Sequence, residues 1–428
     1  MTQRIELKIG NVASTKLKKI GSDSVDCIVT SPPYYGLRKY KAPEVWWDTD
    51  TQYGHSPTEP NNYCECGAWL GQLGLEPDYR MYLNHMLKVT AELKRVLKPT
   101  GTLWWNMGTS YNDKADMQLP TRLSIRMTDE QGWILRNTLI WHKRNHMPSS
   151  VKDRLTNSYE YVFFFTKQRR YFFNLDAVRV PNKGVGVTDE RKQKLITEIY
   201  SIAKSIRGQS QYNTTATGNF LEGERNTKSN RDALNILQQQ EHLTATELIF
   251  LKDYIQNHYG NPLGKNPGDV LELSTMPFKG AHFAVFPPKL PEFCIKAGSP
   301  EEVCSACGKP KVPIVERSKM PSWNKTNKIV EAQNVSENSA LRIGGTAYNK
   351  WKAEHPDVFK GTRPTCTCNA PFEPGVVLDP FAGSGTTMMV ARQLGRSAIG
   401  IKLSEEYAKL IKKRLGWGCG LDIEWKED

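Results

Sequence analysis

The chain has 428 residues, enough for two or three domains with a sizeable hydrophobic core, so its folding need not rely on disulfides. A net charge of +13 favours a polyanionic partner, although many basic proteins bind no nucleic acid. We find no signal-peptide pattern and no apolar run long enough to span a bilayer, which predicts a cytoplasmic protein without a membrane partner. The nine cysteines are clustered, which favours local metal binding in a reducing compartment over a disulfide framework.

Two predicted strands open the chain. Residues 5–9 alternate as in a strand and lead to Gly10-Asn11. The β-branched apolar run at 24–29 predicts a buried strand, and Thr-Ser-Pro-Pro-Tyr-Tyr at 30–35 follows it directly. The two prolines end the strand, because each fixes φ and lacks an N–H group.

The loop at 30–35 has the features of a site for a planar base with an exocyclic amino group. Its stiff backbone presents the carbonyls of Ser31 and Pro32 with little freedom to find internal donors. The hydroxyl of Ser31 and a carbonyl of the proline loop can accept the two amino hydrogens, while Tyr34 stacks on the base. Taken alone, a proline-rich turn with a core tyrosine explains the same residues equally well.

Residues 36–74 are rich in Trp, Pro, Tyr and Gly and predict a long ordered excursion. It contains His55, Cys64 and Cys66, which form an incomplete ligand set for a metal. The sequence leaves a second metal site at this place undecided.

The next segments predict parallel strand–helix–strand units. Apolar residues at helical spacing predict a helix over 78–97 and then a strand over 102–107. A helix around 120–131 and a strand over 134–141 repeat the pattern, and another strand follows at 159–165. His142 and His146 follow the strand at 134–141 and are not assigned as catalytic bases, because a surface loop is the alternative explanation for both.

The composition changes over 171–269. Predicted helices at 188–207 and 231–259 flank a polar stretch at 208–230 rich in Gln, Asn, Thr, Arg and Lys. These side chains suit base edges and phosphates, although a surface loop can have the same composition.

An insertion of about seventy residues separates a predicted helix at 289–297 from the strand at 376, and two cysteine pairs bracket it. The pairs are Cys304-x-x-Cys307 and Cys366-x-Cys368. Thiols at these spacings predict a closed, structural zinc site, and four unligated cysteines are the alternative.

A glycine-rich turn follows the short strand at 376–378. It reads Asp379-Pro-Phe-Ala-Gly-Ser-Gly-Thr-Thr387 and leads into a helix at 388–394. Strand, glycine loop and helix start in this order predict a nucleotide-binding turn. The absence of Gly-Lys-Ser/Thr argues against a triphosphate.

The two motifs together resemble those of the beta-class amino-group DNA methyltransferases. In that family a Ser/Asp-Pro-Pro-Tyr motif precedes a Phe-x-Gly-x-Gly motif for S-adenosylmethionine, and the resemblance covers about three quarters of the chain. It implies an α/β, Rossmann-like methyltransferase fold with a mostly parallel sheet, a largely helical target-recognition region and a small zinc-binding insert. The expected parts are a catalytic half (1–170), a target-recognition region (171–269), a return segment (270–299), a four-cysteine insert (300–370) and a cofactor-binding half (371–428).

The resemblance also implies roles for individual residues. The catalytic residues are Ser31, Pro32, Pro33 and Tyr34. Residues 141–165 resemble the segment that lines the pocket for the extruded base in that family. The residues near the cofactor are Asp379, Pro380, Phe381, Gly383, Ser384, Gly385, Thr386, Thr387, Lys402, Phe283, Phe286 and Asn11. Lys402 departs from the family, which has an acidic residue there for the ribose hydroxyls; a lysine ammonium cannot accept those hydrogen bonds, and Glu405 or Glu406 could substitute.

The resemblance implies methyl transfer to cytosine N4 or adenine N6 in double-stranded DNA, and Ser31 favours cytosine. Transfer to cytosine C5 is set aside, because that reaction uses a cysteine nucleophile and the chain has no Pro-Cys pair. A cognate restriction endonuclease is a candidate partner, and the source would be a prokaryote or a phage. A catalytically impaired, zinc-containing DNA-binding protein and an RNA or protein methyltransferase are the alternatives.

Overall fold

The computed structural model describes most of the chain outside its centre. The described residues are 2–10, 12, 17–49, 54–58, 62–180, 265–276, 286–316, 322–323, 329–330, 358–418 and 423–427, with a few positions between 191 and 248. The chain separates into two compact units, of which the first comprises Met1–Val178, Pro267–Val312 and Pro364–Asp428 and the second Arg179–Asn266 and Pro313–Arg363. Among the described residues, no helix has the length and apolar character that a membrane crossing requires.

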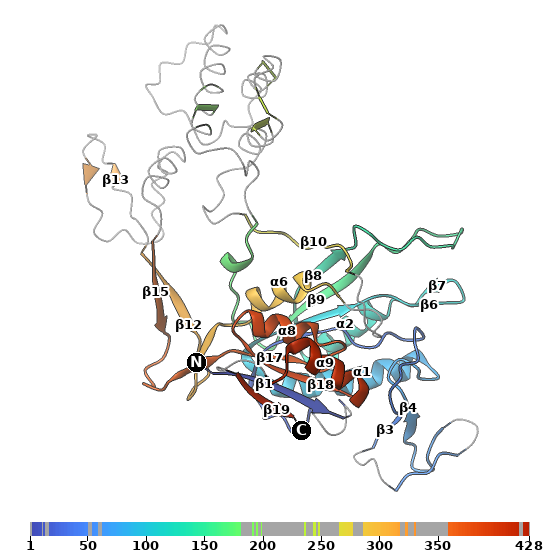
Figure 1. Ribbon diagram of the computed structural model, residues 1–428. Coiled ribbons are helices and arrows are strands. Elements are labelled where there is room, and N and C mark those ends of the chain that lie inside the picture. Colours follow the sequence, from blue (N-terminus) through green and yellow to red (C-terminus); the bar gives the residue numbers. More distant parts are fainter. Residues whose placement is uncertain are drawn as a thin grey trace. The chain divides into compact units, whose positions relative to one another are not determined.

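A nine-stranded sheet forms the centre of the first unit (Figure 1). Its strand order is β10-β8-β9-β5-β2-β17-β18-β1-β19. Only β9 runs antiparallel to its neighbours, so the described sheet is mostly parallel, as predicted. The strands are β1 (Gln3–Ile9), β2 (Val25–Thr30), β5 (Leu97–Met107), β8 (Ile134–His142), β9 (Tyr159–Thr166), β10 (Val270–Glu272), β17 (Val376–Asp379), β18 (Ser397–Lys402) and β19 (Ile423–Glu427).

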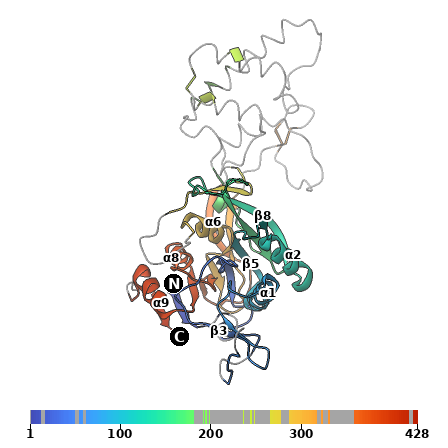
Figure 2. The same ribbon diagram turned by 90° about the vertical axis from the view of Figure 1, so that its right-hand side faces the viewer.

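Helices cover both faces of this sheet (Figure 2). One face packs against α1 (Tyr79–Val96) and α2 (Leu119–Gln131), and the other against α6 (Lys289–Gly298), α8 (Thr386–Gln393) and α9 (Glu405–Leu415). Successive strand residues point to opposite faces. Ile28 and Trp105 therefore belong to one hydrophobic core, and Val29 and Trp104 to the other.

The helix α1 shows why the sequence prediction succeeds in this half of the chain. The side chain of Asp78 caps the helix by accepting a hydrogen bond of 2.7 Å from the Arg80 N–H group. Tyr82, Met86 and Leu93 are fully buried on one side of it, as their spacing predicts.

The other strands of the described residues form five two-stranded sheets. The pairs are β3 (Val45–Trp47) with β4 (Trp69–Gly71), β6 (Tyr111–Asn112) with β7 (Ala115–Asp116), β11 (Glu302–Cys304) with β16 (Phe372–Pro374), β12 (Lys311–Glu316) with β15 (Val358–Pro364), and β13 (Ser322–Trp323) with β14 (Ile329–Val330).

One part of the predicted topology needs correction. The sequence suggests a simple repeat of parallel units, with the strand at 134–141 following the strand at 102–107. Instead β9 lies between β5 and β8 and is antiparallel to both, so β5 and β8 are parallel but not neighbours. Most of the predicted helices at 188–207 and 231–259 lie outside the described residues, and the five-part division of the chain stays a prediction.

The neighbouring strands β2 and β17 mark the point where the chain changes direction across the sheet. From β2 the chain continues to β5 on one side, and from β17 it continues to β18 on the other. In sheets of this kind ligands bind at such a point, outside the carboxyl ends of the strands. The two predicted motifs follow β2 and β17 at those ends.

Candidate active site

The loops after β2 and β17 line a single cavity of about 700 Å³. Ser31 to Tyr34 line it from the first loop, and Asp379 to Ser384 with Thr386 line it from the second. The two loops are also bonded directly, because the Thr30 hydroxyl donates a buried hydrogen bond of 2.7 Å to the Asp379 carboxylate. Segments about 350 positions apart in the sequence thus share one chamber.

A polar network fixes the first loop. The Tyr34 hydroxyl lies 3.2 Å from the Ser31 hydroxyl and donates a hydrogen bond of 2.7 Å to Glu160. Asn106 Nδ2 lies 3.3 Å from Ser31 Oγ and 2.8 Å from Glu160 Oε2, and Lys143 Nζ lies 2.5 Å from Glu160 Oε1. The three added residues come from the ends of β5 and β9 and from just beyond β8, all in the cavity wall.

Burial and a neighbouring charge set the protonation state of Tyr34. Burial, and then the nearby Glu160 carboxylate, raise the pKa of Tyr34 well above its usual value, so Tyr34 remains a neutral phenol. Glu160 accepts hydrogen bonds from three side chains, so both of its carboxylate oxygens are already engaged within the network. Among the described residues, the buried Oδ1 atom of Asn106 has no hydrogen-bond partner.

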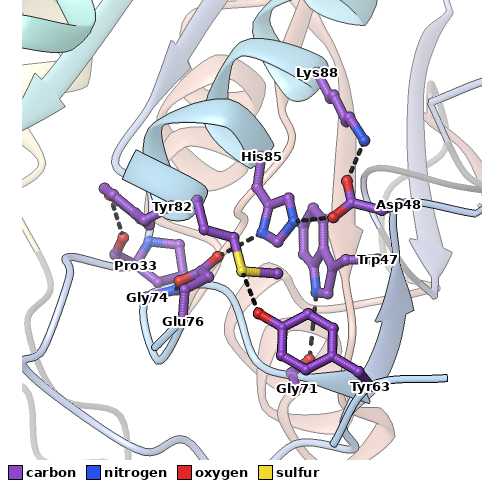
Figure 3. Close-up of polar contacts among 11 residues, drawn as sticks. Pro33, Trp47, Asp48, Tyr63, Gly71, Gly74, Glu76, Tyr82, His85 and Lys88 are labelled. Atoms are coloured by element: carbon purple, nitrogen blue, oxygen red, sulfur yellow. Dashed lines mark hydrogen bonds and ion pairs between the residues drawn. The ribbon is translucent and has the colours of Figure 1, made fainter. Parts of the chain in front are cut away.

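A second network supports the first loop from behind (Figure 3). The Tyr82 hydroxyl donates a hydrogen bond of 2.8 Å to the Pro33 carbonyl. Gly74 has a φ of +93°, and a Cβ atom there would lie 2.8 Å from the Tyr34 carbonyl oxygen. The Gly74 N–H group donates to Glu76, whose other oxygen contacts the buried imidazole of His85. The loop therefore rests on the backbone at Gly74 and on α1.

The glycine loop is held around the Asp379 carboxylate. Asp379 accepts hydrogen bonds from Thr30 Oγ1 and from the Phe381 N–H group. Burial outweighs these contacts and raises the pKa of Asp379 to about 6. Gly385 begins α8 with a φ of +77°, which suits glycine. Arg414 Nη1 on α9 lies 2.7 Å from Ser384 Oγ and steadies the loop.

Lys402 lies in the wall of the cavity, at the end of β18. Burial lowers the pKa of Lys402 to about 8, against the attraction of Asp379. Its ammonium also lies 4.6 Å from the centre of the Tyr407 ring. Glu405 and Glu406 are exposed and are not among the residues that line the cavity, whereas their neighbours Ser404 and Tyr407 are.

Comparison with known proteins identifies the family of the chain that carries these loops. The sequence profile of the N6/N4 family described as DNA methylase matches residues 25–304 and 369–413, which is more than half of the chain. The chain belongs to this family of DNA methylases. It is therefore an S-adenosylmethionine-dependent, amino-group DNA methyltransferase.

Individual relatives of this methylase are more distant. It is 26% identical over 463 residues to the type II methyltransferase M.SfiI of Streptomyces fimbriatus, covering 91% of this chain and 86% of the relative. It is 24% identical over 432 residues to the type II methyltransferase M.SmaI of Serratia marcescens, covering 94% and 88%. Among solved structures, the PvuII DNA methyltransferase (cytosine-N4-specific) covers 100% of this chain and 97% of its own, with 13% identity and a TM-score of 0.44.

The remaining predicted site residues of the methylase fall into three groups. Phe286 lines the cavity. Gly385 and Thr387 are not among its lining residues and instead shape the start of α8, where Thr387 Oγ1 donates to the Val29 carbonyl at 3.3 Å. Asn11 and Phe283 lie outside the described residues.

The four cysteines of the predicted metal site come together in the methylase. The Sγ atoms of the four residues all lie within 4.8 Å of one another; the residues are Cys304, Cys307, Cys366 and Cys368. The Cys307 N–H group lowers the pKa of Cys304 to about 7, whereas the neighbouring thiols of Cys307 and Cys366 raise the pKa of Cys368 to about 12. Four thiolates at this spacing repel one another unless a cation lies between them, so the donor set fits a metal ion.

The family resemblance places 141–165 at the pocket but does not single out Lys143 and Glu160 within it, and Asn106 is missed altogether. A usable signal existed for two of them. Asn106 interrupts an apolar strand, and Glu160 alternates with aromatic residues in another. A polar residue near a strand end is therefore a candidate site residue. That Asn106 and Glu160 lie together depends on β9 pairing with β5, which the local sequence does not show.

Proposed function

We propose that this methylase transfers a methyl group from S-adenosylmethionine to the exocyclic N4 amine of a cytosine flipped out of double-stranded DNA. The observation that carries the proposal is the shared cavity. The groups that can accept hydrogen bonds from an amine and the glycine loop line the same cavity. Its volume of about 700 Å³ lies within the range of small-molecule sites in proteins.

The glycine-loop side of the cavity fits the cofactor. Gly383 lines the cavity without a side chain, so the loop backbone can approach a ligand closely there, whereas Gly385 leaves room for Ile411 of α9. The Asp379 carboxylate offers an anion to the positively charged methionine end, and Ser404 offers a hydroxyl near the start of α9. When bound, S-adenosylmethionine supplies an electrophilic methyl group on its sulfonium.

The first loop prepares the amine. A ring amine is a poor nucleophile, because its lone pair is delocalised into the ring. Ser31 Oγ and the Pro32 carbonyl accept its two hydrogens and thereby leave electron density on the nitrogen. The Pro33 carbonyl already accepts a hydrogen bond from Tyr82. The Pro32 carbonyl is therefore the better candidate acceptor for the second amine hydrogen.

Positioning provides most of the catalysis in this proposal. The chain needs no strong base, because the amino proton becomes acidic once the methyl group is attached and can leave to solvent. This agrees with the engagement of Glu160 by three donors. Stacking on Tyr34 offsets part of the cost of flipping the base, by about 1–3 kcal/mol.

Adenine N6 is the second candidate target. The choice of cytosine rests on Ser31, because the family tends to have serine at this position in cytosine enzymes and aspartate in adenine enzymes. The pocket wall at Asn106 and Lys143 has both donors and acceptors and suits either base edge.

The proposal includes three partners. Double-stranded DNA binds to the basic chain, with 171–269 as the target-recognition region. Zn²⁺ binds to the four-cysteine cluster as a structural ion. A cognate restriction endonuclease accompanies the methylase in its host, because its relatives are named type II methyltransferases.

The test is incubation of the purified protein with unmethylated DNA of mixed sequence and methyl-labelled cofactor, followed by nucleoside analysis. We expect label in N4-methylcytosine, and no label with Ser31→Ala or Tyr34→Ala, although both variants still bind DNA. Label in N6-methyladenine would support the second candidate. Label in RNA or protein alone would contradict the proposal, and DNA binding without any transfer would support a catalytically impaired DNA-binding protein.

A further inference from the structure

Three metal-binding side chains gather between β3 and β4, and none of them lines the active-site cavity. His55, Cys64 and Cys66 each offer one ligand atom, and these atoms all lie within 4.8 Å of one another. His55 Nδ1 and Cys66 Sγ are 3.2 Å apart. The methyl-transfer mechanism uses none of the three.

The backbone turn at Cys64 resembles the turn at Cys304 in the four-cysteine cluster. The Gly67 N–H group donates to the Cys64 carbonyl at 2.8 Å, and the Gly308 N–H group donates to the Cys304 carbonyl at the same distance. Both glycines have positive φ, +87° and +68°. The Cys64 turn is one residue shorter, as the change from Cys-x-x-Cys to Cys-x-Cys requires. Both turns aim two thiols at one point.

The histidine ring is oriented as a metal ligand. His55 Nε2 lies 3.0 Å from the Thr49 hydroxyl, and the ring packs against Trp46 with centroids 5.2 Å apart. A ligating histidine usually donates its second ring N–H to an oxygen, which fixes the tautomer. With Nε2–H donating to Thr49, the lone pair of Nδ1 faces Cys66. A cation between these two atoms satisfies both.

We propose that His55, Cys64 and Cys66 bind a second zinc ion, with the fourth coordination position open to water. Two sulfurs and one imidazole are the donor set that zinc prefers in proteins. The ion fastens the loop between β3 and β4. These strands carry Trp47 and Trp69, whose rings stack on His85 behind the catalytic loop.

The first test is the zinc content of the full-length protein, purified under reducing conditions and measured by mass spectrometry. Wild type should contain two zinc ions per chain. Cys64→Ser and Cys304→Ser should each contain one, whereas Glu65→Gln, a change at the exposed residue between the two cysteines, should retain both. One zinc per chain in wild type, retained by Cys64→Ser and lost from Cys304→Ser, would overturn the proposal.

A cobalt titration distinguishes loss of a ligand from loss of the fold. Apo wild type titrated with Co²⁺ should reach its endpoint at two equivalents, with absorption from cobalt–thiolate bonds for each. His55→Gln keeps all the thiols and should bind one equivalent as tightly as wild type and the second at least about tenfold more weakly. The bound first equivalent shows that the variant is folded. Two equally tight equivalents in His55→Gln would refute His55 as a ligand.

Discussion

Asp379 carries a carboxylate where almost no water reaches it, since its side chain is only 2% exposed. A pKa of about 6 in the folded protein, against an ordinary value of 3.8, means that folding favours the protonated form. The associated stability is fully present below pH 3.8 and is lost as the pH rises through 6. At neutral pH the charge therefore destabilises the protein without cofactor, and in the proposed site the cationic cofactor would compensate for it.

Asp379→Asn should consequently stabilise the protein and weaken cofactor binding. At pH 7.5 we expect the free energy of unfolding to rise by about 1–3 kcal/mol, because the buried charge is removed while Asn can still accept a hydrogen bond from Thr30. The increase in the free energy of unfolding should be smaller at pH 5. Urea denaturation at both pH values measures it, and a loss of stability at pH 7.5 would contradict the assigned charge.

We expect the lowered pKa of Lys402 to affect cofactor binding, because the family resemblance implies that this residue lies where others have an acidic residue for the ribose. Above pH 8 its neutral amine can accept a hydrogen bond from a ribose hydroxyl and no longer repels the sulfonium. Cofactor affinity should therefore rise as the pH passes through about 8. Lys402→Glu should bind the cofactor about tenfold more tightly at pH 7 and lose this rise. Calorimetry from pH 7 to 9 measures both, and weaker binding by Lys402→Glu would show that the lysine favours the cofactor.

Gly108 leaves room for the ring of Tyr34. A Cβ atom at this position would lie 2.9 Å from Tyr34 Cε2. Gly108→Ala should displace the ring and reduce methyl transfer by roughly 10–100-fold, because small misplacements are costly in a positioned reaction. Cofactor affinity should be unchanged. Gly21→Ala is the control, since a Cβ atom there would lie 3.8 Å from Ser24 Cβ, an ordinary contact, and transfer should persist. Full transfer by Gly108→Ala would argue against a fixed Tyr34.

At the scale of elements, the order of the strands decides which parts of the site could be predicted. The loop at 30–35 and the turn at 379–387 are each recognisable from local sequence. Their meeting depends on β2 pairing with β17, which no local pattern reveals and which only the family resemblance implies. The role of Glu160 was not predicted for the same reason, because the pairing of β9 with β5 joins segments far apart in the sequence. The α1 helix was predictable because its cap and apolar spacing are local.

The helix α1 also holds the proposed catalytic loop, through the hydrogen bond from Tyr82 to the Pro33 carbonyl. Tyr82→Phe leaves the Pro33 carbonyl without its donor, which costs about 1–3 kcal/mol if the group stays buried. We expect a roughly tenfold lower transfer rate at saturating cofactor, with cofactor affinity unchanged. Tyr63→Phe, which loses only a weak contact of 3.4 Å to the Met81 sulfur, is the matched control (Figure 3). Equal rates in the two variants would remove Tyr82 from the support of the loop.

At the scale of the whole molecule, the charge of +13 predicts how strongly salt weakens DNA binding. Each phosphate contact releases counterions, so affinity falls steeply with ionic strength. We expect a loss of at least about 100-fold between 50 and 200 mM salt. Fluorescence anisotropy with Ser31→Ala measures binding without turnover. An affinity that does not change with salt would mean that the positive charge has another purpose.

The measurement that tests the account most directly is the structure of the protein bound to S-adenosylmethionine. The account predicts that the cofactor lies along Asp379 to Gly383 and that its sulfonium methyl group points into the shared cavity towards Ser31 and the Pro32 carbonyl. A cofactor bound elsewhere, or one whose methyl group points away from Ser31, would contradict the claim that the two loops serve one reaction.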